Sequence, residues 1–134
     1  MAETIELEIV TPERLVVKDR AESIQIPGRN GYLGVLPGHA PLITELAVGE
    51  IVYVNAGVST RLSVAWGFAE VLPDKVTIIA EAAELAGDID VPRAEAARDR
   101  AQQHIKQAED AAAYEDAAHA LARAEARLSV AQQK

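Results

Sequence analysis

The sequence contains no cysteine among its 134 residues, and only 4% of its residues are aromatic. The lack of cysteine excludes disulfide bonds, thiolate catalysis and cysteine-ligated zinc. Its apolar runs are far shorter than the roughly 20 residues that a membrane helix needs. Residues 1–6 are acidic and contain no apolar signal core, so we expect a chain that starts as a cytosolic product. A formal net charge of −8 argues against a general affinity for nucleic acid or for anionic membranes.

Glycine and proline are confined to the first two thirds of the chain. All eight glycines lie at or before Gly87, and the last of the six prolines is Pro92. Alanine has the opposite distribution, because 15 of the 42 residues in 93–134 are alanine. A chain with 49% apolar residues can bury a core. We therefore expect two domains, residues 1–87 and residues 88–134.

The first domain has the pattern of short β-strands. Ile5, Leu7 and Ile9 alternate with acidic residues, which indicates a strand with one buried face. Further β-prone runs follow, with turn residues about every eight to twelve positions: residues 23–26, 51–55, 61–66, 68–72 and 76–80. No helical crossover fits between these runs, so a parallel sheet is not expected. The pattern predicts an antiparallel sandwich or barrel.

The second domain has the pattern of helix. Asp90 can cap the first turn of a helix, and Pro92 follows where its missing N–H costs nothing. Two apolar seams at helical spacing predict an antiparallel helical hairpin: Ala94, Ala97, Ala101, Ile105 and Ala108, then Tyr114, Ala117, Leu121, Ala124, Leu128 and Ala131. The expected turn, residues 107–113, has neither glycine nor proline, so local preference alone also allows one helix of about 40 residues. With few large side chains in its seams, the hairpin should be marginally stable.

Three arginines of the second domain have no acidic neighbour at helical spacing: Arg100, Arg123 and Arg127. Surface cations on helices are usually supported by such neighbours. If the chain turns near Asp110, Arg93 comes level with Arg127 and Arg100 lies near Arg123. Guanidinium groups bind phosphate oxygens in bidentate geometry, so this cluster suits a polyphosphate such as ATP. The alternative is that the arginines are solvated or contact an acidic partner surface.

Catalysis by this chain alone is not expected. It has no phosphate-binding glycine loop, no dinucleotide-binding glycine turn and no His-Glu-x-x-His metal motif. Magnesium could accompany ATP, but no dedicated carboxylate cage is visible. We expect neither catalytic residues nor protein metal ligands.

Aromatic and turn residues of the first domain divide into core and surface. Trp66 and Phe68 share strand parity with Leu62, which predicts that they pack in the core. The turn at residues 29–31, including Arg29, and the nearby Tyr32 are expected to be exposed to a protein partner. His39 lies in a Pro-Gly turn, and we expect it at a partner interface too.

Four motifs lie in order along nearly the whole chain: Thr-Pro-Glu-Arg at 11–14, Asn-Gly-Tyr-Leu-Gly-Val-Leu-Pro-Gly-His-Ala-Pro-Leu at 30–42, Ala-Trp-Gly-Phe-Ala-Glu-Val at 65–71, and Ile-Asp-Val-Pro-Arg-Ala at 89–94. Together they resemble the epsilon subunit of F-type ATP synthases. The last motif is similar to the nucleotide motif of bacillus-type members. Trp66 stands where that family commonly has a glycine.

The resemblance implies an α+β fold, with an antiparallel β-sandwich of about ten strands followed by the two-helix hairpin. It implies that the sandwich binds the gamma subunit and the c-subunit ring in the central stalk, which couples proton flow to ATP synthesis. It also implies that the hairpin can extend along gamma into the alpha/beta catalytic head and inhibit ATP hydrolysis. The chain would then be peripheral, at the cytoplasmic face of the cell membrane.

For bacillus-type members the resemblance implies that bound ATP favours the folded hairpin. Carried over, the residues expected near adenosine are Glu84, Ile89, Asp90, Arg93 and Ala94. Those expected near the phosphates are Arg100, Arg123 and Arg127, with Arg93 able to serve both parts. Two other functions remain open at this point: a purely structural stalk adaptor without a ligand, and a small hydrolase.

Overall fold

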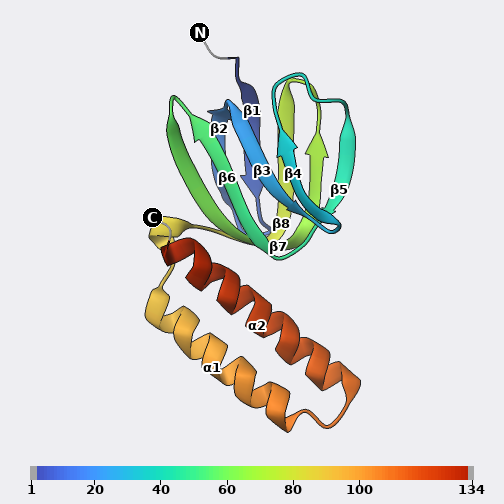
Figure 1. Cartoon of the computed structure of the whole chain (residues 1–134), viewed down its shortest axis with the longest axis vertical. Coiled ribbons are helices and arrows are strands. Elements are labelled where there is room, and N and C mark those ends of the chain that lie inside the picture. The colour runs from blue at the N-terminus through green and yellow to red at the C-terminus, as the bar shows by residue number, and fades with distance from the viewer. Residues whose placement is uncertain (1–2, 133–134) are drawn as a thin grey trace.

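The computed structural model describes residues 3–132 and has an α+β fold, with a β-sandwich followed by two helices. Figure 1 shows the helices together at one end of the sandwich. The strands are β1 Ile5–Val10, β2 Leu15–Ala21, β3 Ser23–Gly28, β4 Gly31–Val35, β5 Leu42–Leu46, β6 Gly49–Asn55, β7 Val58–Val71 and β8 Lys75–Leu85. A 3-10 turn, η1 Ala86–Asp88, leads into α1 Val91–Gln107 and α2 Ala111–Gln132. The expected fold class is confirmed.

The strand order is β2-β1-β8-β7-β5-β3-β4, and β6 pairs with both β3 and β7. Within residues 3–132 there are eight strands where about ten were expected. One reason is that β7 runs unbroken through two predicted strands, pairing first with β6 and then with β5. The pairing of β1 with β8 is parallel, which also departs from the expectation. It needs no local crossover, because the rest of the sandwich connects these two strands.

A bend in β7 at Trp66 and Gly67 reverses the faces that its side chains occupy. Both residues have positive φ angles, 47° and 122°. Before the bend Leu62 points into the sandwich core, whereas after it the inward residues are Ala69 and Val71. The expectation that Trp66 and Phe68 pack in the core was wrong, because strand parity does not continue through a bend. Phe68 is 53% exposed.

The core of the sandwich is aliphatic. Its fully buried side chains come from all the long strands, and the largest are Ile5, Leu7, Ile9, Ile24, Ile26, Ile51, Leu62 and Ile78. The predicted inward face of the first strand is therefore confirmed. Burial at roughly 25 cal/mol per Å² of apolar area makes this cluster the main source of sandwich stability.

One aspartate caps the start of each helix. The Asp90 carboxylate accepts from the backbone N–H of Arg93 at 3.1 Å, which confirms the predicted cap. Asp110 caps α2 in the same way, accepting from the N–H of Ala113 at 2.8 Å. The chain therefore turns at residues 108–110 without glycine or proline, and the expected hairpin is confirmed.

The hairpin seams are built mainly from alanine. Seam residues that are buried are Ala94, Ala101, Ala117, Ala124, Leu128 and Ala131. Tyr114 was expected in the seam but is 54% exposed. It lies in the first turn of α2, where Ala113 and Ala117 line the hollow shared with His104 of α1 and Tyr114 does not.

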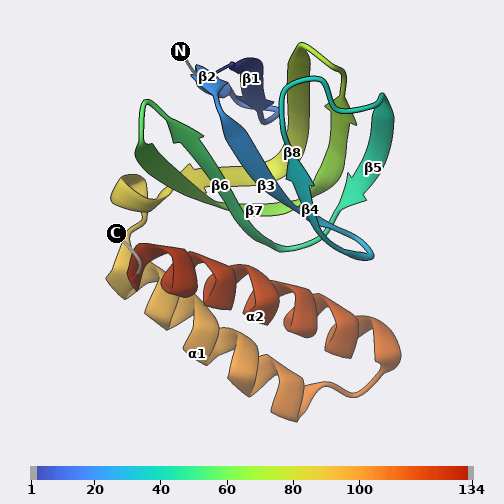
Figure 2. The same cartoon turned by 45° about the horizontal axis from the view of Figure 1, so that its top comes forward.

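Helix α2 lies between α1 and the sandwich, against β7 and β6, as Figure 2 shows. Ser63 and Ala65 of β7 are buried on the face opposite to Leu62, so small side chains underlie the helix. A second, small core forms where the chain leaves the sandwich: Ile89, Val130 and Ala131 are buried together. The two parts of the chain thus have separate cores.

Candidate functional site

A polar cavity of about 390 Å³ lies where α1, the end of α2 and the end of β8 meet. We call it the arginine cavity. It is lined by Glu84, Asp88, Asp90, Arg93, Ala94, Ala97, Arg100 and Arg127. Its volume falls within the range of about 300–1,000 Å³ that is common for small-molecule sites.

Helix α1 forms one wall of the cavity. Arg93, Ala97 and Arg100 follow at spacings of four and three residues, so they lie on one face of the helix. The alanine between the two arginines leaves the space that the cavity occupies. Within residues 3–132 the guanidinium groups of Arg93 and Arg100 form no ion pair, and both residues are exposed. They are therefore free to meet an anion.

Helix α2 and strand β8 close the other side through one ion pair. Arg127 Nε donates to Glu84 Oε1 at 2.6 Å, and the two side chains are 29% and 35% exposed. This contact explains why Arg127 needs no acidic neighbour on its own helix. Its acidic partner comes from the sheet, 43 residues earlier in the chain.

Two of the expected site residues lie elsewhere. Ile89 does not line the cavity and is 6% exposed, packed against Val130 in the small core. Arg123 also lies outside the cavity lining, with its guanidinium carbon 5.3 Å from the centre of the Trp66 ring. The expected convergence of four arginines is therefore wrong in this structure, which gathers three. Spacing along α2 therefore predicted the cavity position of Arg127 and did not predict the position of Arg123. Arg123 contacts Trp66, which was expected in the core.

Sequence reasoning did not include two lining residues, Asp88 and Ala97. Ala97 could have been found, because it sits midway between Arg93 and Arg100 on the same helical face. Asp88 lies in η1 just before the recognised motif, and only the path of the 3-10 turn brings it to the cavity.

The cavity combines three guanidinium groups with three carboxylates. Guanidinium groups bind phosphate or carboxylate oxygens, while carboxylates accept hydrogen bonds from hydroxyl and amino groups. The arrangement suits a ligand that carries both an anionic part and a polar donor part. Among the described residues no group of three or more histidine, aspartate and glutamate side chains is placed to hold a metal ion.

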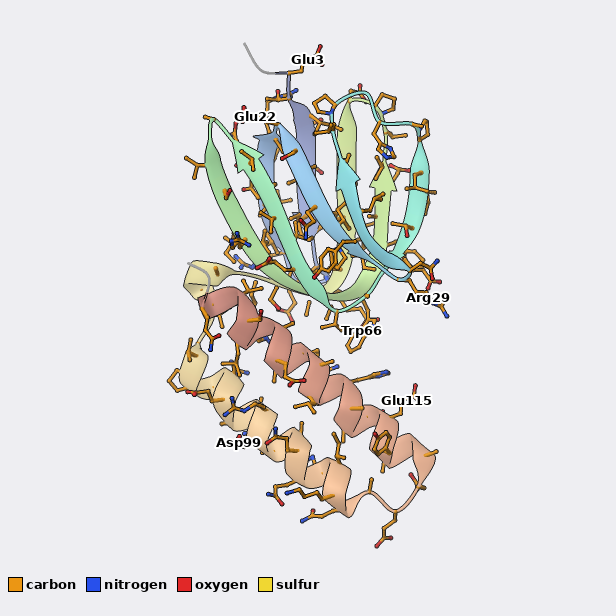
Figure 3. All side chains as sticks on the ribbon, in the orientation of Figure 1. Glu3, Glu22, Arg29, Trp66, Asp99 and Glu115 are labelled. Atoms are coloured by element: carbon orange, nitrogen blue, oxygen red, sulfur yellow. The ribbon has the colours of Figure 1, made fainter. Side chains whose placement is uncertain are left out.

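The residues expected at a partner interface lie at the two ends of β4. Arg29 precedes β4, at the end of the sandwich that faces the helices (Figure 3), and its guanidinium forms an ion pair with Glu45 at 2.7 Å. Tyr32 is 58% exposed, and its hydroxyl accepts from the backbone N–H of Glu50. His39 follows β4, at the opposite end. These residues do not form one site.

An exposed apolar patch covers the outer face of β5, β7 and β8. Phe68 and Ile79 are paired across neighbouring strands, and Ile43 lies on the adjacent strand β5. Their side chains are 53%, 56% and 69% exposed. Large apolar side chains gathered in one exposed patch are typical of a protein interface. We call this set the outer patch.

No helix among residues 3–132 is long and apolar enough to cross a bilayer.

Two family models match consecutive parts of the chain. The ATP synthase Delta/Epsilon chain beta-sandwich domain matches residues 4–86, and the Delta/Epsilon chain long alpha-helix domain matches residues 88–132.

Individual relatives agree with these matches. An ATP synthase epsilon chain from Koribacter versatilis is 66% identical over 79% of this chain and 75% of its own length. Another from Syntrophobacter fumaroxidans is 48% identical over 98% of both chains. A chain in the structure of the Euglena gracilis mitochondrial ATP synthase OSCP/F1/c-ring is 25% identical, with a TM-score of 0.82 over 96% of this chain and 81% of its own. The chain belongs to the ATP synthase delta/epsilon family.

Proposed function

We propose that the chain is the epsilon subunit in the central stalk of an ATP synthase, without a catalytic site of its own. Support comes from the family matches over both domains and from the likeness to a chain in an F1/c-ring assembly. Its sandwich binds the gamma subunit and the c-subunit ring and passes torque between them. The chain is then peripheral, at the cytoplasmic face of the cell membrane.

The second part of the proposal is that ATP regulates the hairpin through the arginine cavity. The observation that carries it is that the cavity is shared by three elements: Arg93 and Arg100 come from α1, Arg127 from α2 and Glu84 from β8. A polyphosphate bound there contacts both helices and the sheet at once. A ligand that binds only the folded form stabilises it by RT ln(1 + [L]/Kd), about 2.7 kcal/mol at a hundredfold excess over Kd.

The chemistry of the cavity fits ATP. The three arginines supply the donors that phosphate oxygens need, and Glu84 and Asp90 can accept hydrogen bonds from the adenosine part. In this proposal falling ATP releases the hairpin, which extends along gamma into the alpha/beta head and inhibits ATP hydrolysis. Magnesium, where it takes part, arrives with the phosphates.

We assign the outer patch to the gamma subunit. The patch presents Phe68 and Ile79 side by side on a rigid sheet. Exposed aromatic and aliphatic anchors of this kind carry much of the affinity of protein interfaces. The assignment depends on membership of the stalk and is independent of ATP binding.

Calorimetric titration of the isolated chain with ATP, with and without Mg²⁺, tests the regulatory proposal. The variant is Arg100→Ala, and the matched control is Arg98→Ala, which lies on the same helix, pairs with Asp99 and does not line the cavity. Hydrogen bonds to charged groups contribute about 1.5–3 kcal/mol, so Arg100→Ala should weaken binding roughly 10- to 100-fold. Arg98→Ala should bind as the wild type does. Absence of heat from the wild-type chain in both titrations would refute ATP regulation.

The second candidate is a fixed brace without a ligand. Its support is that two contacts already hold α2 on the sandwich: the ion pair of Arg127 with Glu84 and the packing of Trp66 against α2. A brace predicts no ATP binding and a hairpin position that does not respond to ATP. The same titration separates the two functions.

A further inference from the structure

Trp66 leaves the sandwich at the bend in β7. Its φ angle of 47° lies in the left-handed region, where residues other than glycine are uncommon. The following Gly67 has a φ of 122°, and an added Cβ there would overlap the carbonyl oxygen of Ile79. The glycine therefore lets β7 pass close to β8 at the bend. Figure 3 shows that the indole projects from the sandwich toward α2.

Two side chains of α2 contact the indole of Trp66. The ring centres of Trp66 and His119 are 4.9 Å apart, with the ring planes inclined at 56°. The Arg123 guanidinium carbon lies 5.3 Å from the indole centre, within the range of a cation–π contact. His119 and Arg123 are one helical turn apart, so they contact the same aromatic group from one face of α2.

We propose that Trp66 and Arg123 form a latch that holds α2 against the sandwich in the absence of any ligand. Arg123 then belongs to the latch and is not a phosphate ligand. The inference deepens the proposed function, because it requires a hairpin that can undock, but it does not require that ATP be what controls it.

The surroundings of the latch suit a reversible contact. Beneath α2 the buried residues of β7 are the small Ser63 and Ala65, which bury little apolar area. Trp66 therefore provides the largest apolar side chain that β7 offers to the helix. The bend at Trp66 and Gly67 turns the indole out of the sandwich, while β7 residues on both sides of the bend remain in the core.

The arginine cavity gives independent support. Arg127 lies one turn beyond Arg123 and lines the cavity, whereas Arg123 does not. One helix face thus presents two cations to two different sites on the sandwich: Arg127 to Glu84 at 2.6 Å, and Arg123 to the indole. These contacts hold α2 at two successive turns.

The test measures docking directly. Because the chain has no cysteine and one tryptophan, spin labels at Lys18→Cys and Glu125→Cys are unique, and indole fluorescence reports on Trp66 alone. Both replaced residues are exposed. Label distances are recorded without ATP along a urea series, so that docked and undocked populations are both measurable. The variants are Arg123→Ala and Arg123→Lys, with Ser129→Ala, exposed on the same helix, as the control.

The latch predicts that Arg123→Ala lowers the docked-to-undocked ratio about two- to fivefold, the range for a half-exposed cation–π contact. Indole emission should shift to longer wavelength as the ring gains water. Arg123→Lys, which keeps a cation, should restore part of the ratio, and Ser129→Ala should leave it unchanged. An unchanged ratio in Arg123→Ala would overturn the latch.

Calorimetry with ATP separates the latch from a phosphate-binding role. If Arg123 acts only through docking, Arg123→Ala lowers the affinity for ATP by no larger a factor than it lowers the fraction of docked chains. A 10- to 100-fold loss of affinity with an unchanged docked ratio would make Arg123 a phosphate ligand and refute the latch. Failure of ATP regulation has a different result: the wild-type distances would not respond to ATP, while the ligand-free comparison still decides the latch.

Discussion

Arg127 on α2 and Glu84 on β8 form an ion pair of 2.6 Å that joins the helical hairpin to the sandwich. Glu84 pairs with Ser63 on β7, and Ser63 pairs in turn with Glu50 on β6. A row of polar side chains therefore crosses the sheet on the face where α2 lies. Both residues of the ion pair also line the arginine cavity. The contact that holds α2 on the sheet is therefore part of the candidate ligand site.

We predict that Glu84→Gln lowers the stability of the ligand-free chain by about 0.2–1 kcal/mol, the range for ion pairs that retain contact with solvent. The reason is that Arg127 loses a charged partner at the interface between helix and sheet. Chemical denaturation at low and high salt measures the effect, which should shrink in high salt. Glu45→Gln is the control, because its pair with Arg29, at 2.7 Å, is nearly as short, but the side chains of Arg29 and Glu45 are 72% and 48% exposed. An equal loss in both variants would contradict the prediction.

We predict that Gly67→Ala is strongly destabilising, by roughly 3 kcal/mol or more. The new Cβ would overlap the backbone of Ile79, and the φ of 122° is closed to alanine. Gly87→Ala is the matched control, because nothing lies within 4 Å of its Cβ position. Thermal unfolding of both variants gives the comparison. Similar melting temperatures for the two would show that β7 can change its path at the bend.

The bend also explains where sequence reasoning succeeded and failed. Alternation located β1 and the core-facing residues correctly, because a regular strand obeys a period of two. It failed at Trp66 and Phe68, since the positive φ angles at the bend are invisible to a pattern of apolar residues. Three strands, β2, β4 and β5, were not recognised from the sequence. Most of their residues are exposed or half-buried, so they lack the apolar alternation that marks a strand with one buried face.

The site followed the same division. Local rules placed Asp90 as a cap and put Arg93 and Arg100 on one helical face, and the structure brings both arginines to the cavity. The pairing of Arg127 with Glu84 could not be predicted from spacing, because it depends on how α2 docks on the sheet. Arg123 was misplaced because its position depends on Trp66, whose side chain was expected in the core.

A pH dependence is expected from Tyr53. Burial, and then its hydrogen bond to Asp19, raise the pKa of the Tyr53 phenol above its usual value of about 10. The folded chain thus holds this proton more tightly than the unfolded chain does. That contribution to stability is complete below about pH 10 and is lost as the pH rises through the pKa of the folded state.

The variant Tyr53→Phe removes both the titrating group and the bond of 3.0 Å to Asp19. Stability at neutral pH should fall by about 1 kcal/mol, and the alkaline loss of stability should become shallower. Urea denaturation between pH 7 and pH 11 measures both effects. An alkaline slope as steep in the variant as in the wild type would assign the loss to other groups.

We predict that Phe68→Ser weakens assembly with the gamma subunit about tenfold or more without lowering the stability of the chain. The side chain is 53% exposed, so its removal leaves no cavity, while truncation of an aromatic anchor at an interface often costs more than 1 kcal/mol. Val58→Ser, on a residue that is 65% exposed outside the outer patch, is the control. Binding of each variant to purified gamma subunit decides the assignment.

The turn between the helices contains one side-chain cap, Asp110. Asp110 accepts from the N–H of Ala113 at 2.8 Å, and the residues around it are good helix formers. We predict that Asp110→Ala destabilises the hairpin by about 1 kcal/mol. Without the cap, residues 108–110 can join α1 and α2 into one helix, which is incompatible with the antiparallel pair.

Circular dichroism and label distances between Gln102→Cys and Glu125→Cys measure this change. Both replaced residues are exposed, one on each helix. In Asp110→Ala the helical content should rise slightly while the population with a short distance between the helices falls. Glu109→Ala, an exposed neighbour, should leave the distances unchanged. If Asp110→Ala keeps the short distance as the wild type does, packing of the alanine seams is sufficient to impose the turn, and the hairpin is more stable than its thin core indicates.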